Sequence, residues 1–114
     1  MKNIVILGST GSIGKNTLEV ARNLKDKFRV VGLSSNSRWE LLAEQVEEFK
    51  PTYVALNDSQ LGEKLKRRFP DNHLKILTGN KCLEEIVLHE EVDVVVSAVV
   101  GAVGLPAAIA TVQQ

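Results

Sequence analysis

Three glycines, Gly8, Gly11 and Gly14, lie at intervals of three residues directly after the apolar run 4–7. A run of four aliphatic residues that ends at a glycine is typical of a strand buried on both faces. Apolar positions after Gly11 recur at helical spacing, so the glycines lie where a strand passes into a helix. A helix N-terminus presents unpaired N–H groups, and glycines let a phosphate approach the backbone. The segment therefore predicts a phosphate-binding turn.

The spacing G-x-x-G-x-x-G differs from the commoner dinucleotide fingerprint G-x-G-x-x-G, and glycine triplets also occur in ordinary turns. Placement separates the two interpretations. The triplet follows a predicted strand and precedes a predicted helix at 12–26, which is the context that a nucleotide fingerprint requires. We therefore favour a nucleotide-phosphate turn.

Strand-like and helix-like segments alternate along the rest of the chain. Further strands are predicted at 28–33, 53–56, 74–77 and 92–98, with helices between them and a last helix from Leu105-Pro106. This alternation is typical of an α/β fold with a Rossmann-like, doubly wound, mostly parallel sheet and helices on both faces. We expect strand 92–98 to lie beside the first strand, so that segments 8–14 and 101–104 form opposite walls of one crevice.

Composition limits the classes of partner. The 114 residues hold 14 Lys plus Arg and 14 Asp plus Glu, so the formal net charge is zero. We expect no large nucleic-acid-binding surface, and the basic cluster within 64–68 is interpreted as solvated charge. No apolar run reaches membrane-spanning length and no signal peptide is seen, so we expect one cytoplasmic domain without a membrane partner.

The sequence offers little support for metal or thiol chemistry. The lone Cys82 is interpreted as a small hydrophobic residue of a helix. His73 and His89 have no metal-ligand spacing to each other or to Cys82, so we predict no metal site.

The end of the second predicted strand indicates which dinucleotide binds. An Asp or Glu here hydrogen-bonds the ribose of NAD, whereas an Arg accommodates a 2′-phosphate. Segment 34–38 holds only Ser, Asn and Arg, and a guanidinium can hold a phosphate with two parallel hydrogen bonds. We therefore favour NADP over NAD, with Ser37 and Arg38 as phosphate ligands.

Two residues in this region have a second interpretation. Ser37 and Glu40 have the spacing of a capping box, in which the Ser side chain caps the next helix. Both roles are compatible, because a helix N-terminus would itself attract the phosphate. Trp39 is expected either to stack on the adenine or to pack on a neighbouring helix.

Three segments together carry a family resemblance. They read I-L-G-S-T-G-S-I-G at 6–14, E-Q at 44–45 with F-K-P at 49–51, and S-A-V-V-G-A-V-G-L-P at 97–106. Over its whole length the chain resembles the N-terminal NADPH-binding domain of the 1-deoxy-D-xylulose 5-phosphate reductoisomerase family. The resemblance implies isomerisation of 1-deoxy-D-xylulose 5-phosphate and NADPH reduction to 2-C-methyl-D-erythritol 4-phosphate, in the non-mevalonate route to isoprenoids.

The resemblance also implies cofactor contacts at matching positions. The turn bounded by Gly8 and Gly14 is expected to hold the pyrophosphate through Thr10, Gly11, Ser12 and Ile13. The residues expected at the 2′-phosphate are Asn36, Ser37 and Arg38, and those expected beside the nicotinamide are Ala98, Val99 and Gly101. Family members often carry G-K-N at 36–38, so the basic side chain of this chain is displaced by one position.

Other parts implied by the resemblance are expected beyond Gln114. They are the acidic ligands of a Mg²⁺ or Mn²⁺ ion, the pocket for the phosphate of the sugar substrate, and a mobile lid. We therefore expect residues 1–114 to be one NADPH-binding domain of a longer, homodimeric oxidoreductase. On its own this domain should bind cofactor without turnover, and no catalytic residue is assigned within it.

Two rival functions share the first glycine turn. Another NADP-dependent dehydrogenase or a sugar-nucleotide epimerase would have that turn but is not expected to share A-V-V-G-A-V-G-L at 98–105. A dinucleotide-sensing module would bind the cofactor as a regulatory ligand and would need no substrate domain.

Overall fold

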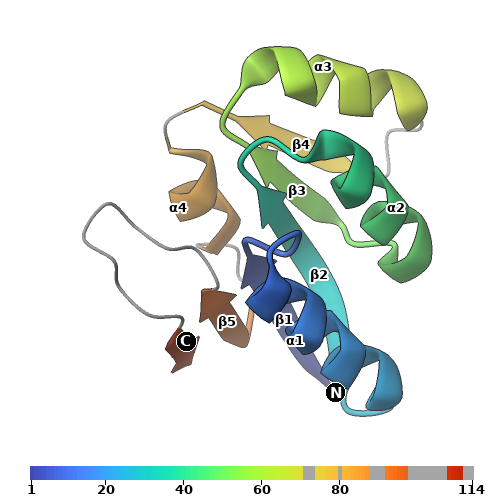
Figure 1. Ribbon diagram of the computed structural model, residues 1–114. Coiled ribbons are helices and arrows are strands. Elements are labelled where there is room, and N and C mark those ends of the chain that lie inside the picture. Colours follow the sequence, from blue (N-terminus) through green and yellow to red (C-terminus); the bar gives the residue numbers. More distant parts are fainter. Residues whose placement is uncertain (71–73, 80, 88–91, 98–107, 112–114) are drawn as a thin grey trace.

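The computed structural model describes residues 1–70, 74–79, 81–87, 92–97 and 108–111, in which strands and helices alternate (Figure 1). The elements in chain order are β1 (Lys2–Leu7), α1 (Ser12–Asn23), β2 (Phe28–Ser35), α2 (Trp39–Phe49), β3 (Tyr53–Leu56), α3 (Ser59–Arg68), β4 (Lys75–Thr78), α4 (Cys82–Val87), β5 (Val94–Ser97) and β6 (Ala108–Thr111).

These strands form one sheet in the order β4-β3-β2-β1-β5-β6. The pairings from β4 through β5 are all parallel, and only β6 runs antiparallel, against β5. The predicted α/β fold with a mostly parallel sheet is confirmed. So is the predicted neighbour of β1, because Ile4 to Leu7 pair with Val94 to Ser97. The chain order reverses at this pair, and parallel sheets bind ligands beyond the carboxyl ends of strands at such a point.

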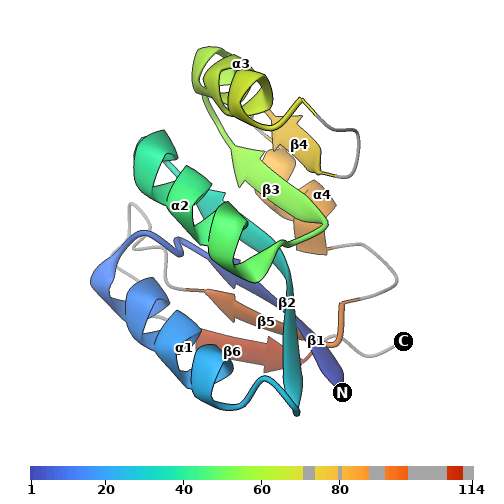
Figure 2. The ribbon, with the colours of Figure 1, turned by 90° about the vertical axis from the view of Figure 1, so that its right-hand side faces the viewer.

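Helices cover both faces of the sheet, as predicted. Helices α1, α2 and α3 lie on one face and α4 lies on the other (Figures 1 and 2). The side chains of β1 alternate between the two layers: Ile4 and Ile6 pack toward α1–α3, whereas Val5 packs toward Ile86 of α4. Complete burial of an aliphatic side chain stabilises the fold by about 1.5–3 kcal/mol, so a shift of β1 by one residue, which would exchange the two faces, would be costly.

Helices α1 and α2 are also joined by an ion pair on their exposed sides. Arg22 Nη2 donates to Glu48 Oε1 at 2.8 Å, and Arg22 Nε pairs with the other carboxylate oxygen. The hydrogen bond from Arg22 lowers the pKa of the Glu48 carboxyl. Because both side chains are about half exposed, the pair contributes little to stability.

The structure differs from the sequence predictions at the edge of the sheet and at the ends of two elements. The helix predicted from Leu105-Pro106 is wrong for 108–111, which form β6 against the edge of β5. An open strand edge offers unpaired backbone groups to a following segment, and Ile109 and Thr111 are β-branched residues that suit a strand. Helix α1 ends at Asn23 rather than at Asp26, and β2 continues to Ser35 rather than ending at Leu33.

No helix in the described residues is long and apolar enough to cross a membrane.

Candidate functional site

The glycine turn joins the carboxyl end of β1 to the N-terminus of α1. Gly8 has φ +78°, in the left-handed region that only glycine adopts freely, and its carbonyl accepts the Gly11 N–H at 3.1 Å. Gly11 is the N-cap of α1, and the first helical hydrogen bond runs from the Lys15 N–H to the Gly11 carbonyl at 2.9 Å. The N–H groups before Lys15 therefore lie at the open end of the helix, and no acidic residue occupies its first turn.

The second and third glycines have different steric roles. A Cβ on Gly14 would lie 2.2 Å from the Gly8 carbonyl oxygen and 2.6 Å from Ser9 Cα, so α1 packs directly on the turn. A Cβ on Gly11 would meet only the Gly8 oxygen, at 3.6 Å, which is an ordinary contact. Gly14 is therefore required by packing within the chain, whereas the space beside Gly11 is open to a ligand.

Hydroxyl groups anchor the turn to the end of β2. The Gly8 N–H donates to Ser34 Oγ at 2.9 Å, and the Ser9 N–H donates to the Ser34 carbonyl at 2.9 Å. Thr10 Oγ1 and Ser35 Oγ share a hydrogen bond of 2.9 Å. The side chains of Ser9, Thr10, Ser34 and Ser35 are all buried, so each polar group depends on these partners. The turn is thus held against β2 by its own backbone and by four small side chains.

A glutamine from α2 holds the turn from a further direction. Gln45 Nε2 donates to the Ser9 carbonyl at 2.9 Å, and Gln45 Oε1 accepts from Ser9 Oγ at 2.6 Å. Ser9 is completely buried and Gln45 is 7% exposed. Both ends of the Gln45 amide therefore contact one residue of the turn.

The residues expected at the 2′-phosphate lie between β2 and α2 and are exposed. Helix α2 begins at Trp39 with Arg38 as its N-cap, and the cap makes no side-chain hydrogen bond. The predicted Ser37 capping box is therefore wrong. Instead the Arg38 N–H donates to Ser35 Oγ at 3.2 Å. The Arg38 side chain has no ion-pair partner within the described residues and is available to an anion.

Trp39 packs between helices. Its ring is partly buried against the core on the α1–α3 face, and Lys64 Nζ of α3 lies 5.8 Å from the ring centroid. This arrangement favours the interpretation in which Trp39 packs on a neighbouring helix.

The structure brings together two of the three predicted groups of site residues. The glycine turn lies beside the segment that follows β2, because the carboxyl ends of β1 and β2 are adjacent. The turn contributes Gly8, Thr10, Gly11, Ser12, Ile13 and Gly14, and the segment after β2 contributes Asn36, Ser37 and Arg38. The Thr10 hydroxyl is used within the chain, whereas Ser12 and Ile13 are exposed at the helix end. The third group, Ala98, Val99 and Gly101, lies outside the described residues. Ser97, which precedes it, pairs with Leu7 at the start of the glycine turn.

Four residues that support the site were not predicted as individual contacts from the sequence. They are Ser9, Ser34, Ser35 and Gln45. A signal for Gln45 was present, because it lies on the same helix face as Leu42, Val46 and Phe49, where a polar residue needs a partner.

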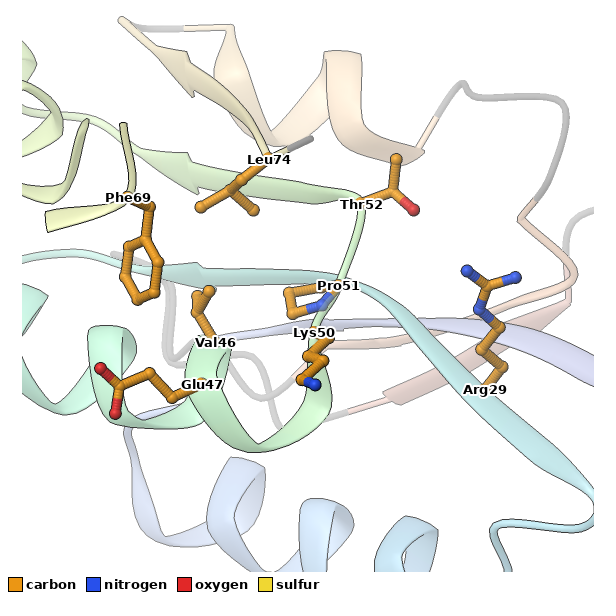
Figure 3. A pocket seen from close by; sticks show the side chains of 8 residues that line it. All are labelled: Arg29, Val46, Glu47, Lys50, Pro51, Thr52, Phe69 and Leu74. Carbon is orange, nitrogen blue, oxygen red and sulfur yellow. The ribbon is translucent and has the colours of Figure 1, made fainter. Parts of the chain in front are cut away.

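A cavity of about 700 Å³ lies at the other end of the sheet, away from the glycine turn (Figure 3). Its wall includes Arg29 near the start of β2, Lys50 and Pro51 after α2, and Thr52 before β3. Since parallel sheets bind ligands at the carboxyl ends of strands, this cavity is not at the expected place.

The described residues contain no group of three or more His, Cys, Asp or Glu residues placed to hold a metal ion. Cys82 is 2% exposed in the core, and burial raises the pKa of its thiol, which confirms its interpretation as a small hydrophobic residue. His73 and His89 lie outside the described residues.

Comparisons with known proteins agree with this geometry. A family model described as 1-deoxy-D-xylulose 5-phosphate reductoisomerase matches residues 4–114. A protein of that name from Thermodesulfovibrio yellowstonii is 48% identical over 105 residues, which are 92% of this chain and 27% of the relative. One from Glaesserella parasuis is 44% identical over an alignment of 115 positions, gaps included, which covers 99% of this chain and 29% of the relative.

Solved structures show the same similarity. A crystal structure of DOX-P reductoisomerase in complex with NADPH, fosmidomycin and magnesium has a TM-score of 0.79 and 37% identity, and the match covers 92% of this chain and 26% of that one. The reductoisomerase from Zymomonas mobilis in complex with NADPH has a TM-score of 0.81 and 25% identity, with coverage of 90% and 27%. The chain therefore spans less than a third of the length of these relatives.

Proposed function

The chain belongs to the 1-deoxy-D-xylulose 5-phosphate reductoisomerase family, and we propose that it forms the NADPH-binding region of such an enzyme. The observation that carries this proposal is the open space beside Gly11. A glycine N-cap there lets a phosphate reach the free N–H groups of α1, whose first turn has no acidic residue to repel it. The NADPH complexes of related enzymes support the same assignment.

The end of β2 supports a preference for NADPH over NADH. The exposed segment from Asn36 to Arg38 contains no carboxylate, and Arg38 at the start of α2 has no ion-pair partner in the described part of the chain. A 2′-phosphate at this place would receive charge-assisted hydrogen bonds from the guanidinium. We assign Arg38 the main contact and Ser37 and Asn36 supporting ones.

We further propose that the chain is part of an enzyme as long as these relatives. We infer that it converts 1-deoxy-D-xylulose 5-phosphate to 2-C-methyl-D-erythritol 4-phosphate, with a divalent cation held by residues outside 1–114. The nicotinamide supplies the hydride when NADPH is bound. The residues of this chain bind and orient the cofactor: the turn holds the pyrophosphate, the 36–38 segment holds the adenosine end, and Ala98, Val99 and Gly101 are proposed to line the nicotinamide. A cytoplasmic homodimer, with no nucleic-acid or membrane partner, stays a prediction.

Fluorescence titration of the chain with NADPH and NADH tests this proposal. Trp39 is the only tryptophan and adjoins Arg38, so its emission reports binding at the start of α2. A hydrogen bond to a charged group contributes about 1.5–3 kcal/mol, so NADPH should bind roughly tenfold to hundredfold more tightly than NADH. Replacing Arg38 with alanine should remove most of this difference and leave NADH affinity almost unchanged.

Arg29→Ala is the matched control, because it removes the same charge at the opposite end of β2. It should keep the preference for NADPH. Equal affinity of the wild-type chain for the two cofactors would overturn the 2′-phosphate assignment, and binding of neither would overturn the proposed function of the turn.

A further inference from the structure

We propose that Gln45 is a positioning residue for the cofactor: it holds the Ser9–Thr10 peptide of the glycine turn in the orientation that receives the pyrophosphate. This inference rests on the proposed function and extends it to a residue of α2 outside the turn. Gln45 uses both ends of its amide on Ser9, through the Nε2 contact of 2.9 Å to the carbonyl and the Oε1 contact of 2.6 Å from the hydroxyl.

The backbone of Ser9 is confined from two directions. On one side Gly14 of α1 is so close that a Cβ there would lie 2.6 Å from Ser9 Cα and 2.8 Å from the Ser9 carbonyl carbon. Gln45 meets the Ser9 carbonyl oxygen from α2. The peptide that leads into Thr10 and Gly11 thus lies between α1 and α2, and its direction determines where the Gly11 N–H and the end of α1 lie. A rotation of this peptide would move the groups that face the phosphate.

The chemistry of the amide explains why glutamine occupies this position. The Ser9 carbonyl needs a donor, and the Ser9 hydroxyl lies 2.6 Å from Gln45 Oε1 and 3.2 Å from the Ser34 carbonyl oxygen, so its shorter hydrogen bond goes to the amide. Leucine offers neither a donor nor an acceptor, and an ionised glutamate offers two acceptors and no donor. A neutral amide satisfies both partners in one orientation. A polar side chain that is 7% exposed costs stability unless it is paired, and both polar atoms of Gln45 are paired with the turn.

Helix α2 also joins the two halves of the proposed site. Arg38 is the N-cap of the helix, and Gln45 lies two turns further along the same element. The residue that holds the pyrophosphate turn and the residue assigned to the 2′-phosphate are therefore carried by one rigid element. The separation of Arg38 and Gln45 along the helix stays fixed, which suits a ligand that carries both a pyrophosphate and a 2′-phosphate.

A Gln45→Glu variant, titrated with NADPH from about pH 5 to about pH 8, tests the inference, because burial raises the pKa of a carboxyl above its usual value. When protonated, the introduced carboxyl can donate to the Ser9 carbonyl as the amide does. When ionised, it repels both that carbonyl and the incoming pyrophosphate. The ratio of variant to wild-type Kd should therefore stay within about threefold at the acid end and rise to roughly tenfold or more at the alkaline end.

The ratio to wild type removes the titration of groups that both proteins share. These include 2′-phosphate ionisation and the charged residues lining the groove between α1 and α2, which are Lys15, Glu19, Arg22, Glu44 and Glu48. Gln60→Glu, on the exposed start of α3, adds the same charge away from the turn and should give a ratio near one throughout.

The Gln45→Leu variant is a second test of this role, which can be used if the glutamate variant does not fold. It removes both hydrogen bonds without adding a charge, so it should weaken NADPH binding about equally at every pH, relative to wild type. A purely structural role would lower the free energy of unfolding of either variant without changing NADPH affinity in the folded protein, and that result would overturn the inference. Failure of the wild-type chain to bind NADPH would instead overturn the proposed function.

Discussion

Replacing Gly14 with alanine should destabilise the chain by about 3 kcal/mol or more, because the new methyl group has no space. Its Cβ would lie 2.2 Å from the Gly8 carbonyl oxygen and within 2.8 Å of two backbone atoms of Ser9. Backbone atoms cannot rotate away as a side chain does, so α1 would have to move off the turn. Urea unfolding followed by Trp39 fluorescence and by circular dichroism would measure the loss.

Gly62→Ala is a useful comparison for this variant. A Cβ at Gly62 would lie 2.5 Å from Thr78 Cγ2, which is the end of a side chain that can adopt another rotamer. It should therefore cost less than Gly14→Ala, although both glycines are buried in helices. If Gly14→Ala kept the wild-type free energy of unfolding within about 0.5 kcal/mol, the close contact between α1 and the turn would be contradicted.

Replacing Gly11 with alanine should have the opposite effect: little loss of stability and a large loss of NADPH affinity. Gly11 has φ −80° and ψ 173°, which alanine adopts freely, and its Cβ would meet only the Gly8 oxygen at 3.6 Å. Alanine is a poorer N-cap than glycine, so a loss of up to about 1 kcal/mol in the free energy of unfolding is expected. The methyl group would occupy the space proposed for the pyrophosphate, and we expect a roughly tenfold to hundredfold increase in Kd.

The two glycine variants separate folding from binding. Isothermal titration calorimetry with NADPH measures affinity, and the same urea unfolding measures stability. Ser12→Ala should keep the affinity of the wild-type chain within about threefold, because the role assigned to Ser12 is carried mainly by its backbone N–H. Unchanged NADPH affinity in Gly11→Ala would mean that the pyrophosphate does not approach this residue.

Much of the fold followed from local patterns. Alternating apolar runs and helical periodicity located β1 to β5 and α1 to α4, and the glycine triplet placed the turn correctly at the end of β1. The position of β5 beside β1 also followed, because crossover connections between parallel strands leave few possible orders. The positions of the elements depend on short-range sequence signals, whereas the strand order follows from the rules of chain connection.

The errors occurred where long-range contacts decide the outcome. Residues 108–111 pair with β5, and no pattern within four residues reveals that an edge is open nearby. The capping-box error is local instead: Arg38 rather than Ser37 is the N-cap of α2, and the Arg38 N–H donates to Ser35 Oγ, three residues earlier. Gln45 and Ser9 are 36 residues apart, so their pairing appears only when α2 has packed beside the turn. The supporting residues of the site were therefore harder to predict than the glycines.

Backbone amide chemical shifts of the chain titrated with NADPH would show whether NADPH binds at the glycine turn with its 2′-phosphate beside Arg38. The largest changes should fall on the amides of Gly11, Ser12 and Ile13 and on those of Ser37 and Arg38. NADH should reproduce the first group and lose most of the second. Changes centred instead on Arg29, Lys50 and Thr52 would place NADPH in the cavity at the opposite end of the sheet and rule out binding at the glycine turn.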